Sequence, residues 1–153
     1  MAKLKTGDPA PAFEAVDQDG NMKTLADYRG RKLILYFYPK DNTPSCTAEA
    51  CSLRDGRDTL RRMGFEVVGV SPDSEKSHQG FIAKQGLNFT LLADTDKKIA
   101  EAYGVWGEKK FMGRTFMGIL RTTFVIDEQG VIEKIFDKVR TKDHFEQIVE
   151  AYQ

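Results

Sequence analysis

Two cysteines, five positions apart, are the side chains of this 153-residue chain that are best suited to redox chemistry. Cys46 and Cys51 follow residues 32–38, an apolar and aromatic run without helical period that is typical of a buried strand. Between this run and the cysteines stand Thr43 and Pro44, the usual helix start of an N-cap residue followed by proline. Cys46 is therefore predicted to lie in the first helical turn, where unpaired N–H groups and the helix dipole favour a thiolate. A thiolate with a second cysteine nearby indicates redox chemistry rather than packing alone.

Simpler interpretations of the two cysteines remain open. A cysteine inside a helix, such as Cys51, is often no more than a small buried hydrophobic residue. A metal site is less favoured, because the spacing is C-x4-C and the two histidines, His78 and His144, lie far away in the sequence. A structural disulfide is also disfavoured, since we see no secretory signal and the bond would close only a short loop.

Helical geometry constrains any bond between the two thiols. Residues five apart on an α-helix differ by about 140° around the axis and about 7.5 Å along it, which separates their Cα atoms by about 8.6 Å. A disulfide needs a Cα separation of about 4.4–6.8 Å. If Cys46 and Cys51 form a disulfide in a catalytic cycle, the start of the helix must therefore unwind each time.

The residues around Cys46 resemble the active-site motif of the peroxiredoxin family. Pro39, Thr43 and Cys46 match its P-x-x-x-T-x-x-C pattern, and residues 38–51 are similar to the bacterioferritin comigratory protein, or peroxiredoxin Q, subfamily. Ser45 departs from the pattern, in which glycine is expected before the first cysteine, and this bears on local backbone freedom and on the rate, but not on the chemistry. The resemblance covers essentially the whole chain and continues through residues 7–13, 69–73, 92–94, 103–109 and 118–127.

The resemblance implies a role for five residues in peroxide reduction. Cys46 would be the peroxidatic nucleophile and Cys51 the resolving thiol, while Pro39, Thr43 and Arg121 would complete the peroxide pocket. Attack of a thiolate on an O–O bond builds negative charge on the leaving oxygen, which an arginine and a hydroxyl group can stabilise by hydrogen bonds. Proline has no N–H and a fixed φ, so it can shape the pocket mouth and shield the thiolate from water.

Three candidate positions also have ordinary structural interpretations. Arg121, taken alone, would most often form a surface salt bridge at the end of a strand. Thr43 would serve as an N-cap, a role that is compatible with a contact to substrate. Glu49, one turn after Cys46, matches a subfamily position, and its alternative is a solvated helical acid.

The rest of the sequence predicts an alternation of strands and helices that ends in a hairpin and a helix. We expect a hairpin turn at residues 17–21, and strands at residues 32–38, 66–71, 89–92, 122–126 and 131–136. We expect helices at residues 43–62, 74–85 and 97–103, and a last helix with Phe145, Ile148, Val149 and Tyr152 on one face. Gly56 is a predicted weak point of the first helix and Gly64 its stop. This order favours an α/β three-layer sandwich, a central mixed sheet flanked by helices with an N-terminal hairpin extension, and the resemblance implies a thioredoxin-like fold.

Residues 106–118 admit two interpretations. Four apolar side chains alternate there with glycines, and these side chains are Phe111, Met112, Phe116 and Met117. In the first interpretation, they form a mobile apolar lip that admits alkyl hydroperoxides or docks a reductase. The more favoured alternative is a loop tucked onto the core, because exposed apolar patches are uncommon.

Length and composition favour one domain spanning residues 1–153. The 23 basic and 23 acidic residues give a formal net charge of zero, which does not support nucleic-acid binding. Without an apolar run of about 18 residues we expect no membrane span. Residues 1–6 lack the apolar core of a secretion signal, so we expect a cytoplasmic protein. We expect no metal, flavin or haem cofactor.

The sequence thus predicts a monomeric thiol peroxidase of the atypical two-cysteine type, acting on hydrogen peroxide and organic hydroperoxides. Cys46 would become a sulfenic acid, Cys51 would condense with it to a disulfide, and thioredoxin or a similar dithiol would reduce that disulfide. A thioredoxin-like disulfide reductase is a disfavoured alternative, because the chain has no C-x-x-C. A non-enzymatic redox sensor is the other alternative.

Overall fold

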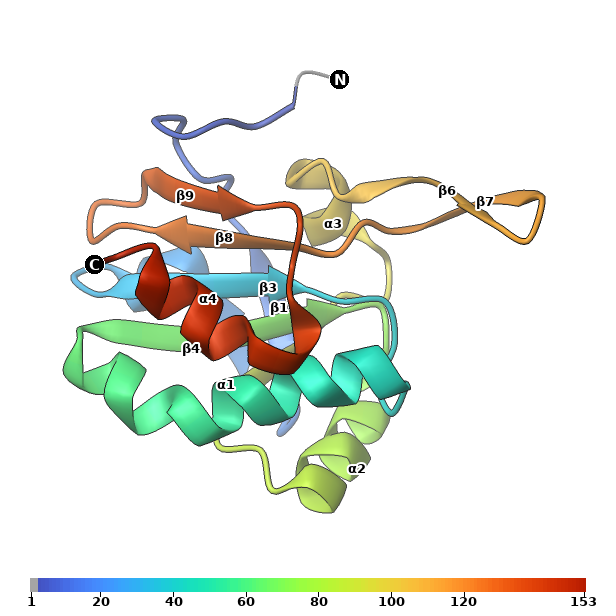
Figure 1. The fold of residues 1–153 in the computed structure, drawn as a ribbon, viewed down its shortest axis with the longest axis horizontal. Coiled ribbons are helices and arrows are strands. Elements are labelled where there is room, and N and C mark those ends of the chain that lie inside the picture. Colours follow the sequence, from blue (N-terminus) through green and yellow to red (C-terminus); the bar gives the residue numbers. More distant parts are fainter. Residues whose placement is uncertain (1–2) are drawn as a thin grey trace.

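The main sheet has seven strands in the order β2-β1-β5-β4-β3-β8-β9 (Figure 1). The structure is a computed structural model that describes residues 3–153. The strands of this sheet are β1 (Glu14–Asp17), β2 (Met22–Thr24), β3 (Lys32–Phe37), β4 (Phe65–Ser71), β5 (Thr90–Ala93), β8 (Thr122–Ile126) and β9 (Ile132–Phe136). Strands β3, β4 and β5 run parallel, and the other neighbouring pairs are antiparallel. The mixed sheet and its N-terminal β1–β2 hairpin are as predicted.

Helices cover both faces of this sheet. They are α1 (Pro44–Arg62), α2 (Glu75–Gln85), α3 (Lys98–Ala102) and α4 (His144–Glu150), with short 3₁₀ turns at Leu25–Tyr28 and Thr141–Asp143. Side chains of α1, α2 and α4 pack with Ile34 and Tyr36 of β3, whereas α3 packs with Leu35 and Phe37 on the opposite face. Alternate side chains of one strand therefore enter two separate cores, which confirms the three-layer sandwich. No helix in the described residues 3–153 is long and apolar enough to cross a membrane.

Helix α1 runs without a break from Pro44 to Arg62 and passes through Gly56. Its buried stripe is Cys46, Glu49, Ala50, Leu53, Gly56 and Leu60, which is the spacing of a single helical face. Helix α4 comes close to α1 at Gly56. A Cβ atom at this position would lie 2.1 Å from Cδ1 of Phe145, so only glycine allows the contact.

A comparison of two glycines tests this close approach. Gly56→Ala should lower the free energy of unfolding by about 1–3 kcal/mol, because Phe145 must move to make room. Gly80→Ala in α2 is the control, since its added Cβ would meet nothing within 4 Å. This control should raise the stability by up to about 1 kcal/mol through helix propensity. Urea unfolding of both variants measures the difference, and equal stabilisation by the two substitutions would contradict it.

Strands β6 (Trp106–Phe111) and β7 (Arg114–Ile119) form an antiparallel ribbon that projects from the rest of the molecule (Figure 1). The expected loop tucked onto the core is therefore wrong. The apolar side chains of the ribbon are in contact with solvent, with exposed fractions of 67% for Phe111, 86% for Met112, 47% for Phe116 and 52% for Met117.

Candidate active site

Cys46 lies in the first turn of α1, just beyond the end of β3. Thr43 is the N-cap, with φ −87° and ψ 154°, and Pro44 occupies the first helical position, as predicted. The Cys46 side chain packs into the core between α1 and the sheet, and the residue is only 1% exposed. Its sulfur is thus held at the positive end of the helix dipole and largely shielded from water.

Arg121, in the link between β7 and β8, connects Cys46 to Glu49. Its Nη2 donates to Cys46 Sγ at 3.4 Å, and its Nη1 donates to Glu49 Oε1 at 2.6 Å. Cys46 and Glu49 are three positions apart on one helical face, so a single guanidinium fork reaches both. The bond to buried Glu49 fixes Arg121, and the rest of the fork is free to act on the sulfur.

The opposite charges of Arg121 and its neighbours Glu49 and Cys46 offset the cost of burying them. Burial raises the pKa of Glu49 to about 7, although the neighbouring Arg121 acts in the other direction. Burial alone would lower the pKa of Arg121, but the adjacent Glu49 and Cys46 outweigh it and raise that pKa above its ordinary value. Arg121 therefore stays positively charged, and the pKa of Glu49 lies near neutral pH.

The structure places Pro39 and Thr43 on the segment that joins β3 to α1. Thr43 Oγ1 donates to the carbonyl oxygen of Lys40 at 2.8 Å and does not cap the helix. The Thr43 carbonyl accepts from the amide of Thr47 at 2.8 Å, which begins the helical bonding. Thr43 is therefore an N-cap by its backbone, and its hydroxyl must turn away from Lys40 before it can donate to a substrate.

Cys51 lies on α1 and is half-buried against the end of α2. Its Sγ is 3.6 Å from Oε1 of Gln85, and Arg54 Nη1 donates to the Gln85 carbonyl at 2.5 Å. Both cysteines are reduced and belong to one continuous helix. The expected geometric obstacle to a disulfide therefore exists in this structure.

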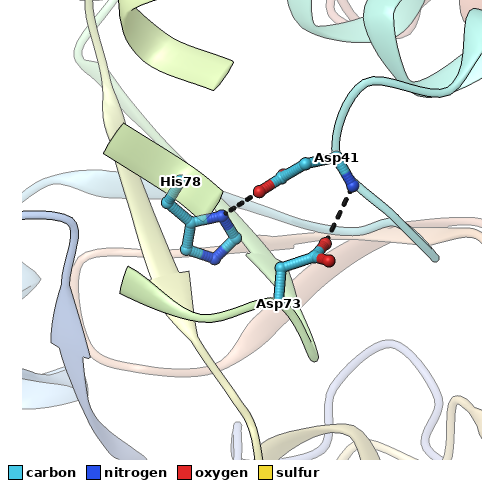
Figure 2. Close-up of side chains that lie close together, drawn as sticks. All are labelled: Asp41, Asp73 and His78. Atoms are coloured by element: carbon cyan, nitrogen blue, oxygen red, sulfur yellow. Dashed lines mark hydrogen bonds and ion pairs between the residues drawn. The ribbon is translucent and has the colours of Figure 1, made fainter. Parts of the chain in front are cut away.

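A second buried polar cluster fixes the residues immediately before α1 (Figure 2). Asp41 accepts a hydrogen bond from the ring of His78 at 2.7 Å, and its backbone N–H donates to Asp73 at 2.8 Å. Tyr38 and Ser77 also donate to the Asp41 carboxylate, at 2.6 Å and 2.8 Å. Ligand-type atoms of Asp41, Asp73 and His78 lie within 4.8 Å of one another, but these hydrogen bonds already occupy them. The cluster ties the start of α1 to β4 and α2.

A cavity of about 600 Å³ opens beside Arg121, on the side of the sheet that α3 covers. Apolar side chains form most of its wall, including Tyr103, Leu120, Phe124 and Ile135. Lys109 of β6 also lines it and donates to the carbonyl of Ile119 at 2.8 Å. Arg121 thus has an apolar cavity on one side and the Cys46 sulfur on another.

Both histidines, which the sequence left far from the cysteines, lie beside the start of α1. His78 contacts Asp41, and His144 Nε2 is 3.7 Å from Glu49 Oε2. Burial lowers the pKa of His144 to about 4, so the imidazole is neutral and this contact is not an ion pair. The one sequence signal for the position of His144 was the apolar face predicted for the last helix, because His144 directly precedes Phe145 on that face.

A buried cysteine at a helix start, paired with an arginine on a thioredoxin-like sheet, is the arrangement of a thiol peroxidase. The profile of the AhpC/TSA family matches residues 6–135 of the chain. The chain belongs to this family and is a peroxiredoxin. It is 50% identical over 150 residues to the putative peroxiredoxin bcp of Haemophilus influenzae, covering 98% of this chain and 97% of that protein. It is 47% identical over 149 residues to peroxiredoxin Bcp of Escherichia coli, covering 97% and 96%.

Solved structures of similar proteins share the fold. The bacterioferritin comigratory protein of Xanthomonas campestris, studied for its alkyl peroxide reduction activity, has a TM-score of 0.85 and 34% identity, covering 91% of this chain and 88% of that chain. A cysteine-to-serine mutant of Xylella fastidiosa PrxQ has a TM-score of 0.92 and 33% identity, covering 99% and 97%. The similarity therefore extends over nearly the whole chain.

Proposed function

We propose that the chain reduces hydrogen peroxide and organic hydroperoxides through a cycle of its two cysteines. The Cys46 thiolate attacks one peroxide oxygen, the O–O bond breaks, and the leaving oxygen takes a proton to give water or an alcohol. Cys51 then attacks the sulfenic acid at Cys46, which releases water and forms a disulfide. An external dithiol reduces this disulfide by exchange and is itself oxidised.

The contact between Arg121 and the sulfur of Cys46 carries this proposal. At 3.4 Å from Sγ, the guanidinium stabilises the attacking thiolate and is placed to donate to the oxygen that leaves. Full ionisation of an ordinary thiol would accelerate attack at pH 7 by at most about thirtyfold. Donors that act on the transition state must therefore supply the rest, and Thr43, once its hydroxyl turns, is the second candidate.

The cavity beside Arg121 supports organic hydroperoxides as substrates. Its mostly apolar wall suits a hydrocarbon group, while Arg121 belongs both to the cavity and to the Cys46 site. The related Xanthomonas campestris protein was studied for alkyl peroxide reduction. A hydroperoxide whose hydrocarbon occupies this cavity would bring its O–O group toward Arg121.

Thioredoxin or a similar dithiol protein is the reductant we propose. Cys46 is 1% exposed, so a protein thiol cannot reach it until α1 opens. The same burial argues against a general disulfide reductase, which must offer its reactive sulfur at the surface. We further propose that the chain works as a monomer in the cytoplasm, because its two thiols complete the cycle within one helix and need a reducing compartment.

A coupled assay tests the proposed activity. Consumption of NADPH in the presence of thioredoxin, its reductase and this protein should depend on added peroxide. An insulin-reduction assay with this protein and a small-molecule dithiol, without thioredoxin, separates the disulfide reductase from the peroxidase. Slow oxidation of Cys46 without turnover would instead favour a redox sensor.

Oxidation is expected to unwind the start of α1, because Cα atoms five apart on a helix lie beyond disulfide reach. Amide exchange between Thr43 and Cys51 should become faster in the oxidised protein, while β3 and β4 stay protected. The hydrogen-bonded Asp41 should mark the beginning of the segment that opens. Hydrogen exchange on both redox states measures this, after mass spectrometry has confirmed the bond. Equal protection of residues 43–51 in the two states would contradict the opening mechanism.

A further inference from the structure

His78 of α2 has a hydrogen-bond acceptor at each of its ring nitrogens (Figure 2). Nδ1 is 2.7 Å from Oδ2 of Asp41, and Nε2 is 2.9 Å from the carbonyl oxygen of Leu92 in β5. A carbonyl oxygen can only accept, so Nε2 must carry a proton. The contact with Asp41 needs a second proton, because a bare Nδ1 and a carboxylate oxygen would repel each other at this distance. The two side chains together therefore hold two protons.

The other partners of Asp41 place the second proton on the histidine. Tyr38 donates to Oδ1 of Asp41 at 2.6 Å, and Ser77 donates to Oδ2 at 2.8 Å. A carboxyl group that already accepts from two hydroxyl groups is favoured in its ionised form. His78 is therefore an imidazolium that forms an ion pair with Asp41, and the two side chains are 0% and 1% exposed.

This ion pair attaches Asp41 firmly to α2. Removal of either partner of a buried pair is unfavourable, because it leaves the other charge without compensation. A second carboxylate, Asp73 from the link between β4 and α2, holds the backbone of Asp41. Its Oδ2 accepts from the amide of Asp41 at 2.8 Å and from the hydroxyl of Ser71 at 2.7 Å. Both the side chain and the backbone of Asp41 are thus fixed.

Asp41 lies two positions before the N-cap of α1, so its attachment orders the approach to that helix. Asn42 has a φ of 63°, a left-handed conformation that asparagine tolerates better than most residues. Thr43 Oγ1 then donates back to the carbonyl of Lys40 at 2.8 Å. With Asp41 held in place, this turn is already formed when the first turn of α1 closes, which lowers the entropic cost of closing it.

We propose that His78 is a positioning residue of the peroxidase cycle, which holds Asp41 and thereby limits how often the start of α1 opens. The proposal rests on the function proposed for the two cysteines and adds the group that regulates their meeting. The closed helix start keeps Cys46 beside Arg121, where peroxide is attacked. Only the open one can bring Cys46 within disulfide reach of Cys51.

Two reactions compete for the sulfenic acid that forms at Cys46. In the open state the Cys51 thiol attacks its sulfur, the hydroxyl group leaves as water, and the disulfide forms. In the closed state the sulfur instead attacks a second peroxide, which gives sulfinic acid and releases water or an alcohol. A tighter hold on Asp41 favours the second reaction, so His78 sets the balance between recycling and over-oxidation.

Two substitutions of His78 separate its two hydrogen bonds. The amide nitrogen of glutamine lies as many bonds from Cα as Nε2 of histidine, and that of asparagine as many as Nδ1. His78→Gln can therefore still donate to Leu92 but loses Asp41, whereas His78→Asn keeps a donor for Asp41. His78→Gln is the test variant and His78→Asn its matched control.

Hydrogen exchange on the reduced protein measures the opening directly. Amides of residues 47–51 should exchange about tenfold faster in His78→Gln, because one charge-assisted hydrogen bond to Asp41 is lost. The acceleration should be smaller in His78→Asn, and β3 and β4 should stay protected in both. Equal acceleration in the two variants, or none in either, would overturn the proposal. No peroxide is used, so this result stands even if the proposed peroxidase activity fails.

A single turnover with peroxide measures the consequence for the cycle. Mass spectrometry of quenched samples follows thiol, sulfenic acid and disulfide with time. Conversion of the sulfenic acid to the disulfide should be about tenfold faster in His78→Gln, while the first attack, which occurs in the closed state, should not become faster. Simple damage to the pocket would slow the first attack and leave the second step unchanged, which would contradict the proposal.

Ser77→Ala is the second variant, to be used if His78→Gln fails to fold. Ser77 is only half-buried, and the change removes one donor to Asp41 without stranding the charge of His78. Both readouts should shift in the same direction as for His78→Gln, by a smaller factor. Unchanged exchange of residues 47–51 in Ser77→Ala would overturn the proposal.

Discussion

Replacing Cys46 by serine should abolish peroxide reduction. A hydroxyl in the first turn of α1 is not ionised at neutral pH, even with Arg121 beside it, and cannot attack the O–O bond. Peroxide-dependent NADPH consumption in the coupled thioredoxin assay should therefore fall to background. Serine is close to cysteine in size, so the packing around this buried position is retained and the loss reports chemistry rather than unfolding.

Cys51→Ser is the matched comparison, because it removes the other thiol of the same helix. This variant should still consume one equivalent of peroxide at the normal rate, since Cys46 and Arg121 are intact. Without a resolving thiol, the sulfenic acid at Cys46 should accumulate and become over-oxidised, and the variant should lose efficient turnover with thioredoxin. Mass spectrometry detects these additions on Cys46. Activity in Cys46→Ser together with an inert Cys51→Ser would mean that the two roles are reversed.

Much of the fold could be predicted from local pattern. The helix start at Thr43 and Pro44, the stop at Gly64 and the strand at 122–126 all agree with the structure, because each is set by residues adjacent in the chain. The ribbon β6–β7 could not be predicted in this way. Its facing pair Gly107 and Gly118 lacks cross-strand side chains, which removes the alternating pattern of a strand.

The sequence of the turn between β6 and β7 also gave no sign of a hairpin. Met112 and Gly113 have φ angles of 51° and 77°, the left-handed values of a two-residue hairpin turn. Asparagine or aspartate usually occupies the first of these positions, so methionine gave no signal there. The exposed apolar side chains further favoured a buried loop, which the structure does not have.

The polar surroundings of Cys46 were beyond local inference for another reason. Glu49 was given two interpretations, and the structure shows a fully buried acid instead of a solvated one. Its burial depends on Arg121 and His144, which lie far away in the sequence, just before β8 and at the start of α4. Spacing along a helix indicates which side chains share a face, but not which distant charges that face will meet.

Arg121→Ala is expected to slow peroxide attack by about a hundredfold. Loss of one charge-assisted donor in a water-poor site costs on the order of 3 kcal/mol of transition-state stabilisation. The thiolate should also need a higher pH to form, because Arg121 supplies the positive charge next to Sγ. Stopped-flow measurement of peroxide consumption across a pH range separates the two effects, since ionisation saturates at high pH and the donor contribution does not.

Arg121→Lys is the control that retains the charge without the planar fork. Lysine cannot hold Glu49 and the sulfur together as the two Nη atoms do, at 2.6 Å and 3.4 Å. We therefore expect Arg121→Lys to recover thiolate formation but only part of the rate. If raising the pH alone returned Arg121→Ala to the unmodified rate, Arg121 would act solely on ionisation, and the donor to the leaving oxygen would have to be sought at Thr43.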